Sequence, residues 1–349
     1  MKRNAKLRLL VIYILFILVF TTSCSGEKLS AVVVDHDQFS ENVGMADAPT
    51  EIQGTGLGFV KPEHRDIPPF ERPQTEEINI GKYEDLSIYL ILLNNSEKEI
   101  TFLVTVLLDY QQINFSLDGK EGILHEVDVP PSTELELPMN IDVAGEGVHD
   151  LQVVAFEDPY NKTLQMDYRM NIHGYVASRR TVIVKGKNEN PVRKIKVIEA
   201  DNPPQGQGTS FGFPLLFAKS PSGDTPSHPS QRQLYVDQAK AGETYSFQLW
   251  LSNHGRNEAV DLALIPFMDY KQVKLRSQDM FQEVLVVHLE PNEEAILDAE
   301  IKLPENPGVH EMQFVYLYDP YKSILHDEVF SPFVFGSPRV AIDVYSKRD

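Results

Sequence analysis

Apolar and polar positions alternate over short segments along most of this chain, and no long stretch keeps a helical period. In residues 245–251, one face carries Tyr245, Phe247, Leu249 and Leu251, and the other carries Ser246 and Gln248. A period of two is typical of a half-buried strand. Further strands are predicted at residues 86–92, 100–108, 134–137, 149–156, 181–184, 259–268, 295–301, 310–318 and 340–344.

Turn signals separate these segments. Residues 94–99 and 253–258 are rich in Asn, Gly and charged residues, which supply the positive φ angles of tight turns. Residues 61–75 and 220–231 are rich in proline, which prevents a regular hydrogen-bond ladder. Many short strands between frequent turns are the pattern of a β-sandwich.

The chain contains this pattern twice. GVHDLQVVAFEDPY at residues 147–160 returns as GVHEMQFVYLYDPY at residues 308–321, which is 161 residues later. Asp109-Tyr110 returns as Asp269-Tyr270 at a spacing of 160, and Asn94 returns as Asn253 at 159. A spacing that drifts by single residues indicates small loop insertions between two copies of one fold. We predict one repeat at residues 45–187 and a second at 192–349, joined by a linker that permits either contact or free swinging.

The strand-to-turn rhythm between the Asn turn and the Asp-Pro-Tyr segment resembles Ig-like or fibronectin-like modules of bacterial surface proteins. The resemblance implies an all-β fold with two tandem Ig-like antiparallel β-sandwich domains. It lies at the level of architecture, and it implies no catalytic residues. The Cys–Trp–Cys core of antibody-type domains is absent, because the chain has one cysteine.

The N-terminus has the features of an export signal. Basic residues at positions 2–8 precede an apolar run at residues 9–20, which is shorter than the ~20 residues of a membrane span. Small residues then stand directly before Cys24, the single cysteine. This arrangement resembles a bacterial lipoprotein signal, although Thr21 stands where lipoboxes usually carry Leu. The alternatives are an ordinary signal peptide or an uncleaved anchor with an incidental cysteine.

The lipoprotein resemblance implies a signal peptide at residues 1–23, a lipid on Cys24, and an extracytoplasmic protein anchored to the bacterial cell membrane. Residues 24–44 then form a tether, in which residues 32–34 are either an added edge strand or linker. Acidic residues outnumber basic ones by 51 to 32, which argues against nucleic acid as a partner. The partners predicted are the membrane, through the lipid, and an unidentified envelope protein or glycan.

The repeated Asp and Tyr residues are the candidate ligand-binding set. They are Asp109, Tyr110, Asp158, Tyr160, Asp269, Tyr270, Asp319 and Tyr321. Tyrosine joins a flat apolar face to a hydroxyl, so a patch of Asp and Tyr suits a sugar or a peptide. The structural interpretation is that Asp caps a turn, Pro fixes φ, and Tyr covers the sandwich edge. Exposed rings would favour ligand capture, and buried rings would favour a scaffold.

Other motifs give no catalytic or metal chemistry. His149 and His310 recur, but no second ligand recurs at metal spacing. The glycine-rich segments 54–58 and 206–212 lack the Lys and hydroxyl of a P-loop, so we expect close backbone packing or a flap docked by Phe59 and Phe213. We therefore predict no metal, no cofactor and no enzymatic activity. The function predicted is a membrane-anchored binding or scaffolding module, and the alternative is capture of carbohydrate or peptide by the tyrosine-rich corners.

Overall fold

The structure is a computed structural model that describes residues 32–35, 54–68, 71–73, 77–171, 176–186, 197–199, 215–221, 228–278, 280–320 and 334–346. The predicted signal peptide, Cys24 and Tyr321 lie outside these ranges. Within them, no helix is long and apolar enough to cross a membrane. The described residues form four β-sheets, two from each repeat, so the prediction of an all-β sandwich fold is confirmed.

Each repeat has an outer and an inner sheet. In repeat 1 the outer sheet contains β2 (Thr55–Val60), β4 (Leu86–Asn94), β10 (Thr133–Ile141), β7 (Phe115–Leu117) and β8 (Lys120–Gly122), with β1 (Val32–Asp35) on β10. The inner sheet contains β3 (Glu77–Ile80), β12 (Val176–Lys185), β11 (Gly147–Glu157), β5 (Ile100–Leu108) and β6 (Gln111–Ile113), with β9 (His125–Val129) on β5. A short helix, α2 (Met166–Asn171), lies between β11 and β12, and the 3-10 turn η2 (Pro62–His64) follows β2.

Repeat 2 has the same order of shared strands, with β13 and β24 added to its inner sheet. Its outer sheet contains β14 (Leu215–Lys219), β16 (Thr244–Ser252), β22 (Glu294–Lys302), β19 (Leu275–Ser277) and β20 (Met280–Gln282). Its inner sheet contains β15 (Val236–Lys240), β25 (Val340–Tyr345), β23 (Gly308–Tyr318), β17 (Val260–Met268), β21 (Leu285–Leu289) and β13 (Val197–Glu199), with β18 (Lys271–Gln272) on β17 and β24 (Phe335–Gly336) on β23. The 3-10 turn η4 (Pro229–Gln231) precedes β15.

Asn94 and Asn253 fix the equivalence of the two repeats residue by residue. Asn94 Nδ2 donates to the carbonyls of Lys98 (2.8 Å), Val129 (2.9 Å) and Pro130 (3.0 Å). Asn253 Nδ2 donates to the corresponding carbonyls, which belong to Glu258 (2.9 Å), Leu289 (3.3 Å) and Glu290 (3.0 Å). The repeated Asn is therefore a buried clamp between two turns, which satisfies backbone groups that would otherwise lack partners.

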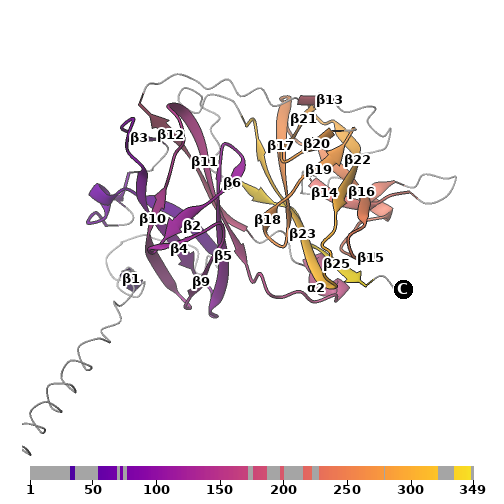
Figure 1. Ribbon diagram of the computed structural model, residues 1–349, viewed down its shortest axis with the longest axis horizontal. Coiled ribbons are helices and arrows are strands. Elements are labelled where there is room, and N and C mark those ends of the chain that lie inside the picture. Colours follow the sequence, from indigo (N-terminus) through magenta and orange to yellow (C-terminus); the bar gives the residue numbers. More distant parts are fainter. Residues whose placement is uncertain are drawn as a thin grey trace, which may run out of the picture.

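Three apolar clusters hold the four sheets in a stack. One cluster lies between the two sheets of repeat 1, and a second lies between those of repeat 2. The third joins the inner sheets to each other, with Leu107 and Phe156 from repeat 1 against Phe267 and Leu317 from repeat 2. Figure 1 shows the two repeats side by side, with β5, β6 and β11 turned toward β17, β18 and β23. The sequence left open whether the two repeats touch or swing on the linker. In the structure the repeats are in contact.

Two local predictions are also settled. β1 pairs antiparallel with β10 from Val32↔Glu136 to Asp35↔Thr133, so residues 32–35 are an added edge strand. The first glycine-rich segment is no flap, because it forms β2 and pairs Gly56 with Leu93 on β4. The domain boundaries given above stay predictions.

The pairing of the aromatic residues is corrected by register. Phe59 pairs with Leu90, and Phe217 pairs with the equivalent Leu249, so the counterpart of Phe59 is Phe217 and not Phe213. Residue 213 itself lies outside the described ranges. The spacing is 158 residues between Phe59 and Phe217 and 159 between Leu90 and Leu249, so the two copies differ by only one residue between these positions.

Candidate functional site at the junction of the repeats

The repeated Asp-Tyr pairs form the tight turns β5–β6 and β17–β18. Asp109 and Tyr110 have φ angles of 51° and 68°, and Asp269 and Tyr270 have 47° and 66°. Two positive φ angles in a two-residue loop define a type I′ turn, whose twist matches that of the flanking strands. Tyrosine is uncommon in this left-handed region, so another interaction must compensate the local strain.

The aspartates hold these turns to the neighbouring strand. Asp109 Oδ1 accepts from the backbone N–H of Asp150 at 3.1 Å, and its Oδ2 lies 2.9 Å from His149 Nδ1. In repeat 2, Asp269 Oδ1 accepts from the N–H of Glu311 at 3.1 Å, and its Oδ2 lies 2.5 Å from His310 Nδ1. The recurrence of histidine is thereby explained, because each ring orients the aspartate of a turn.

The tyrosines reach across to the opposite repeat. Tyr110 is 1% exposed and Tyr270 is 3% exposed, and both belong to the cluster between the inner sheets. The Tyr110 hydroxyl donates to the carbonyl of Pro320, and the Tyr270 hydroxyl donates to the carbonyl of Pro159 at 2.8 Å. Burial raises the pKa of Tyr270 to about 12, so the hydroxyl stays a donor at neutral pH.

Two glutamines complete a reciprocal interface. The N–H of Gln112 donates to Gln272 Oε1 at 2.6 Å, and the N–H of Gln272 donates to Gln112 Oε1 at 2.9 Å. Their amide Nε2 atoms donate to the carbonyls of Tyr270 (3.0 Å) and Tyr110 (2.8 Å). Each residue therefore meets its own counterpart, as in the isologous interface of a symmetric dimer. The pseudo-two-fold axis passes between Gln112 and Gln272.

The Asp-Pro-Tyr corners supply the acceptors for this interface. Asp158 and Asp319 have φ angles of 44° and 48°, which turn the chain at the end of β11 and β23. The Asp158 N–H donates to the Thr101 carbonyl at 3.0 Å, and the Asp319 N–H donates to the Asp261 carbonyl at 2.7 Å. Both bonds present the following proline carbonyl to a tyrosine of the other repeat.

The tyrosines of the two Asp-Pro-Tyr corners are the last predicted residues. Tyr160 is 61% exposed, and its hydroxyl donates to Glu126 on β9. Tyr321 is not among the described residues. The structure therefore brings together Tyr110, Tyr270 and the two Asp-Pro turns at the junction, and it places the Tyr160 ring on the surface. Ligand binding by these residues stays a prediction.

Buried ion pairs at the junction are not apparent from the sequence. Arg180 on β12 donates to both Asp150 carboxylate oxygens, with the Nη2–Oδ2 distance at 2.6 Å, and its Nη2 also reaches the Pro320 carbonyl at 3.0 Å. Burial opposes ionisation of this guanidinium, but the Asp150 carboxylate outweighs it and raises the pKa of Arg180. An arginine within a strand does not indicate, from the sequence alone, with which acidic residue it pairs.

A second ion pair crosses between the repeats. Arg169 on α2 of repeat 1 donates through Nη1 and Nη2 to the two carboxylate oxygens of Glu311, both at 2.7 Å. Both side chains are 0% exposed. A bidentate Arg–carboxylate pair is directional as well as strong, so it fixes α2 against β23 of repeat 2. The partners are 142 residues apart, and no local pattern connects them.

Lys162 adds a partly exposed contact between the repeats. Its Nζ lies 2.8 Å from Asp269 Oδ1. Burial opposes ionisation of Asp269, but hydrogen bonds from His310 and Lys162 outweigh it and hold the pKa of this carboxyl below its usual value. Across the described ranges, no group of three or more His, Cys, Asp or Glu side chains is placed to hold a metal ion.

Comparison with known proteins gives only a distant likeness of fold. No family model matches the chain, and no curated protein matches it. One similar solved structure is the ASH / PapD-like domain 7 of human CEP192, at 14% identity, with 47% of this chain and 99% of that chain covered and a TM-score of 0.22. At this TM-score the match assigns no family to the chain.

Two further similar structures are enzymes. A family 123 glycoside hydrolase from Clostridium perfringens matches at 12% identity over 32% of this chain and 23% of that chain, with a TM-score of 0.22. A red sea bream transglutaminase matches at 10% identity over 85% of this chain and 32% of that chain, with a TM-score of 0.21. The chain thus spans less than a third of either enzyme.

The prediction that the protein is not an enzyme is contradicted by the likeness to the glycoside hydrolase. The absence of a known catalytic motif is weak evidence against activity, because catalytic residues can come from positions far apart in a sequence. At 12% identity and low coverage, the likeness establishes no enzymatic activity for this chain.

Proposed function

We propose that the protein is an extracytoplasmic lipoprotein, held in the bacterial cell membrane by a lipid on Cys24, whose two sandwiches act together as one binding or scaffolding module. The lipid supplies the anchor, because buried acyl chains contribute about 0.8 kcal/mol per methylene group. The partner on the other side is an envelope protein or glycan.

The observation that supports this proposal is the reciprocal junction of the repeats. Tyr110 and Tyr270 each bond to the opposite repeat, and the inner sheets share one apolar cluster. Two modules joined in this way keep a fixed spacing, so surfaces on both repeats face a partner with a defined geometry. A flexible pair would have to order its linker on binding, at a cost in affinity.

The alternative, capture of carbohydrate or peptide by the tyrosine-rich corners, requires exposed rings at the corners. Tyr110 and Tyr270 are buried against the opposite repeat, and Tyr160 is exposed. The burial of the two hairpin tyrosines favours the scaffold, because a ligand at those rings would have to separate the repeats.

The anchor is tested by metabolic labelling with a lipid precursor in cells that produce the wild-type chain, Cys24→Ala or Ser23→Ala. We expect label and membrane association in wild type and Ser23→Ala, and loss of both in Cys24→Ala. Ser23→Ala is the matched control, because it changes the neighbouring residue and keeps the thiol. Equal labelling of all three chains would refute the anchor.

The scaffold is tested separately with photo-crosslinking side chains at Tyr83 and Phe281, which are 91% and 69% exposed in repeats 1 and 2. In intact cells we expect each position to crosslink to an envelope component, with yields that fall in the Cys24→Ala chain. A crosslinker at the buried Leu262 is the control for nonspecific reaction. Absence of adducts at both exposed positions would contradict the proposal.

A further inference from the structure

Each inner sheet ends at one side in an edge strand, β3 in repeat 1 and β15 in repeat 2, and we call this side the rim of the sandwich. The two rims differ at a pair of equivalent positions. Ile78 pairs with Ile183, which lies opposite His149, and Asp237 pairs with Ile342, which lies opposite His310. Because the two histidines are repeat counterparts, Asp237 occupies the place of Ile78. Repeat 2 therefore has a polar residue on its edge strand β15, at the position where the edge strand β3 of repeat 1 has an aliphatic residue.

The neighbouring rim position changes in the same way. Leu86 pairs with Ile141 at the start of β4, and Tyr245 pairs with Ile301 at the equivalent place on β16. Ile78 and Leu86 are both buried in the core of repeat 1. In repeat 2 the Tyr245 hydroxyl donates to Asp237 Oδ2 at 2.7 Å. Two core aliphatics are thus replaced by a hydrogen-bonded Asp–Tyr pair.

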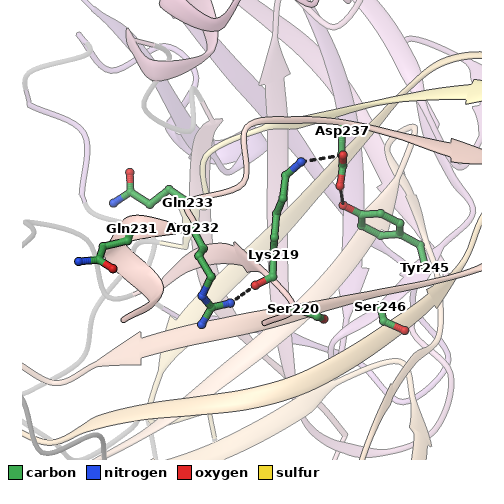
Figure 2. Close-up of a pocket in the computed structure, with 8 residues that line it drawn as sticks. All are labelled: Lys219, Ser220, Gln231, Arg232, Gln233, Asp237, Tyr245 and Ser246. Carbon is green, nitrogen blue, oxygen red and sulfur yellow. Dashed lines mark hydrogen bonds and ion pairs between the residues drawn. The ribbon is translucent and has the colours of Figure 1, made fainter. Parts of the chain in front are cut away.

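This replacement accompanies an open hollow of about 540 Å³ at the rim of repeat 2. It is lined by Lys219, Ser220, Gln231, Arg232, Gln233, Asp237, Tyr245 and Ser246. Figure 2 shows Lys219 and Tyr245 converging on the Asp237 carboxylate, with the two glutamines and Arg232 on the opposite side. The volume lies within the range of about 300–1,000 Å³ typical of small-molecule sites.

The Asp237 carboxylate is ionised and held in place. Its Oδ1 lies 2.8 Å from Lys219 Nζ, and its Oδ2 accepts from Tyr245. Burial opposes ionisation, but the hydrogen bonds from Lys219 and Tyr245 outweigh it and hold the pKa of Asp237 below its usual value. The group is therefore a fixed acceptor at neutral pH.

The fold itself does not require these polar residues. Repeat 1 closes the same rim with Ile78 and Leu86, and a partly buried carboxylate is less favourable there than an aliphatic side chain. A polar network at a position where the same fold accepts apolar packing is typical of a functional site. The difference between the rims therefore indicates a ligand site that belongs to repeat 2.

We propose that this hollow binds a saccharide. Sugar hydroxyls both donate and accept hydrogen bonds, and the lining offers both kinds of group within one surface. Its glutamine amides and serine hydroxyls each donate and accept, Asp237 accepts, and Lys219 and Arg232 donate. The Tyr245 ring adds an apolar wall beside these polar groups.

Other ligand classes fit the lining less well. A phosphate or another compact anion prefers a site made of donors alone, and the ionised Asp237 would repel it. An apolar ligand would leave the Asp237 and Lys219 charges without solvent and without new partners. A saccharide satisfies donors and acceptors together, so it is the class that this lining fits best.

The test is binding of the purified chain to an array of neutral and acidic bacterial and host oligosaccharides, followed by calorimetry with the best binder. The test variant, Asp237→Ile/Tyr245→Leu, installs the two rim residues of repeat 1. We expect at least tenfold weaker binding, with a melting temperature equal to or above that of the wild type. Retained folding separates loss of the site from loss of the domain.

A second pair of variants locates the site independently. Lys219→Ala removes a donor from the hollow, and Lys61→Ala removes the lysine that follows β2 at the corresponding place in repeat 1. We expect several-fold weaker binding from Lys219→Ala and none of this loss from Lys61→Ala. Failure of the wild-type chain to bind any saccharide on the array, or equal binding by wild type and Asp237→Ile/Tyr245→Leu, would overturn the proposal. Neither result depends on the lipid at Cys24.

Discussion

The two repeats carry the same hydrogen-bonding residues at the axis where they meet and different residues at their far rims. At the pseudo-two-fold axis, Gln112 contacts Gln272 and each tyrosine contacts the opposite Asp-Pro turn. Near such an axis the same residue type stands on both sides of a contact. A change in one repeat alone therefore leaves its counterpart in the other repeat without a partner. At the rim each repeat packs only on itself, and there Ile78 and Asp237 diverge. The comparison teaches that the hydrogen-bonded residues at the axis are constrained more tightly than the residues at the rim.

The acidic residue after each histidine shows how far the symmetry extends. In repeat 1, Asp150 pairs with Arg180 of the same repeat. The equivalent Glu311 of repeat 2 pairs with Arg169 from the other repeat. The helix in the β11–β12 loop supplies Arg169, so the ion pair of Glu311 joins the two repeats whereas that of Asp150 stays within one.

The largest expected effect comes from breaking this tie. Arg169→Ala leaves the Glu311 carboxylate buried without its bidentate partner, and loss of one member of a buried pair typically costs about 3–5 kcal/mol. The free energy of unfolding, from urea denaturation, is the measurement. The double variant Arg169→Met/Glu311→Met removes both charges and should recover most of the loss. A single variant as stable as wild type would show that the ion pair contributes nothing to the junction.

A second, smaller effect is expected from the two hairpin tyrosines. Tyr110→Phe and Tyr270→Phe each remove one hydroxyl that bonds to the opposite repeat, and each should cost about 1–2 kcal/mol. The Tyr110 hydroxyl also lies 2.6 Å from the Asp150 carboxylate, whereas the Tyr270 hydroxyl accepts from Arg339, so Tyr110→Phe should be the costlier of the two changes. Tyr160→Phe, on the exposed ring, is the control and should change little. A larger loss from Tyr270→Phe than from Tyr110→Phe would contradict this order.

The sequence contained a signal of this junction that period-two reasoning did not use. β4 alternates between buried and less buried residues along its length. β5 and β17 instead read as nearly continuous apolar runs, and their later residues are buried on both faces. A strand buried on both faces requires a layer on each side, which is the pattern of internal sheets. The inner sheets were therefore recognisable in principle, although their partner was not.

The ion pairs and the polar hollow were beyond prediction from the sequence for a physical reason. Arg169 and Glu311 meet because two sheets dock, and docking depends on shape over many residues at once. The equivalence of Asp237 with Ile78 lies at the same spacing of 159 residues as that of Asn94 and Asn253, but the sequence does not show that Lys219, Asp237 and Tyr245 converge on one hollow. The strands, the Asn clamps and the duplicated turns were predictable, because each rests on neighbouring residues.

The reciprocal glutamines test whether the axis itself is stabilising. Gln112→Ala removes the acceptor of the Gln272 N–H and a donor to the Tyr270 carbonyl, at an expected cost of about 1 kcal/mol. Gln272→Ala should cost the same. The double variant should cost less than the sum of the two, because both single changes break one shared network. Strict additivity in urea denaturation would indicate that the two amides act independently.

The smallest expected effect distinguishes the two Asp-Tyr turns by pH. Lys162 pairs with Asp269 across the repeats, and Lys162→Met should cost about 0.5–1 kcal/mol at neutral pH, as a partly exposed ion pair does. The folded-state pKa of Asp269 lies below its unfolded value near 3.9, so its contribution is complete above that value and is lost as pH falls through the folded pKa. The difference in melting temperature between wild type and Lys162→Met should therefore be largest at pH 6–7 and shrink as the pH falls below the unfolded value of about 3.9. Lys162→Arg keeps the charge and serves as the control. A difference that stays constant over this range would mean that Lys162 acts through packing, and the turn in repeat 2 would then lose its electrostatic distinction from the turn in repeat 1.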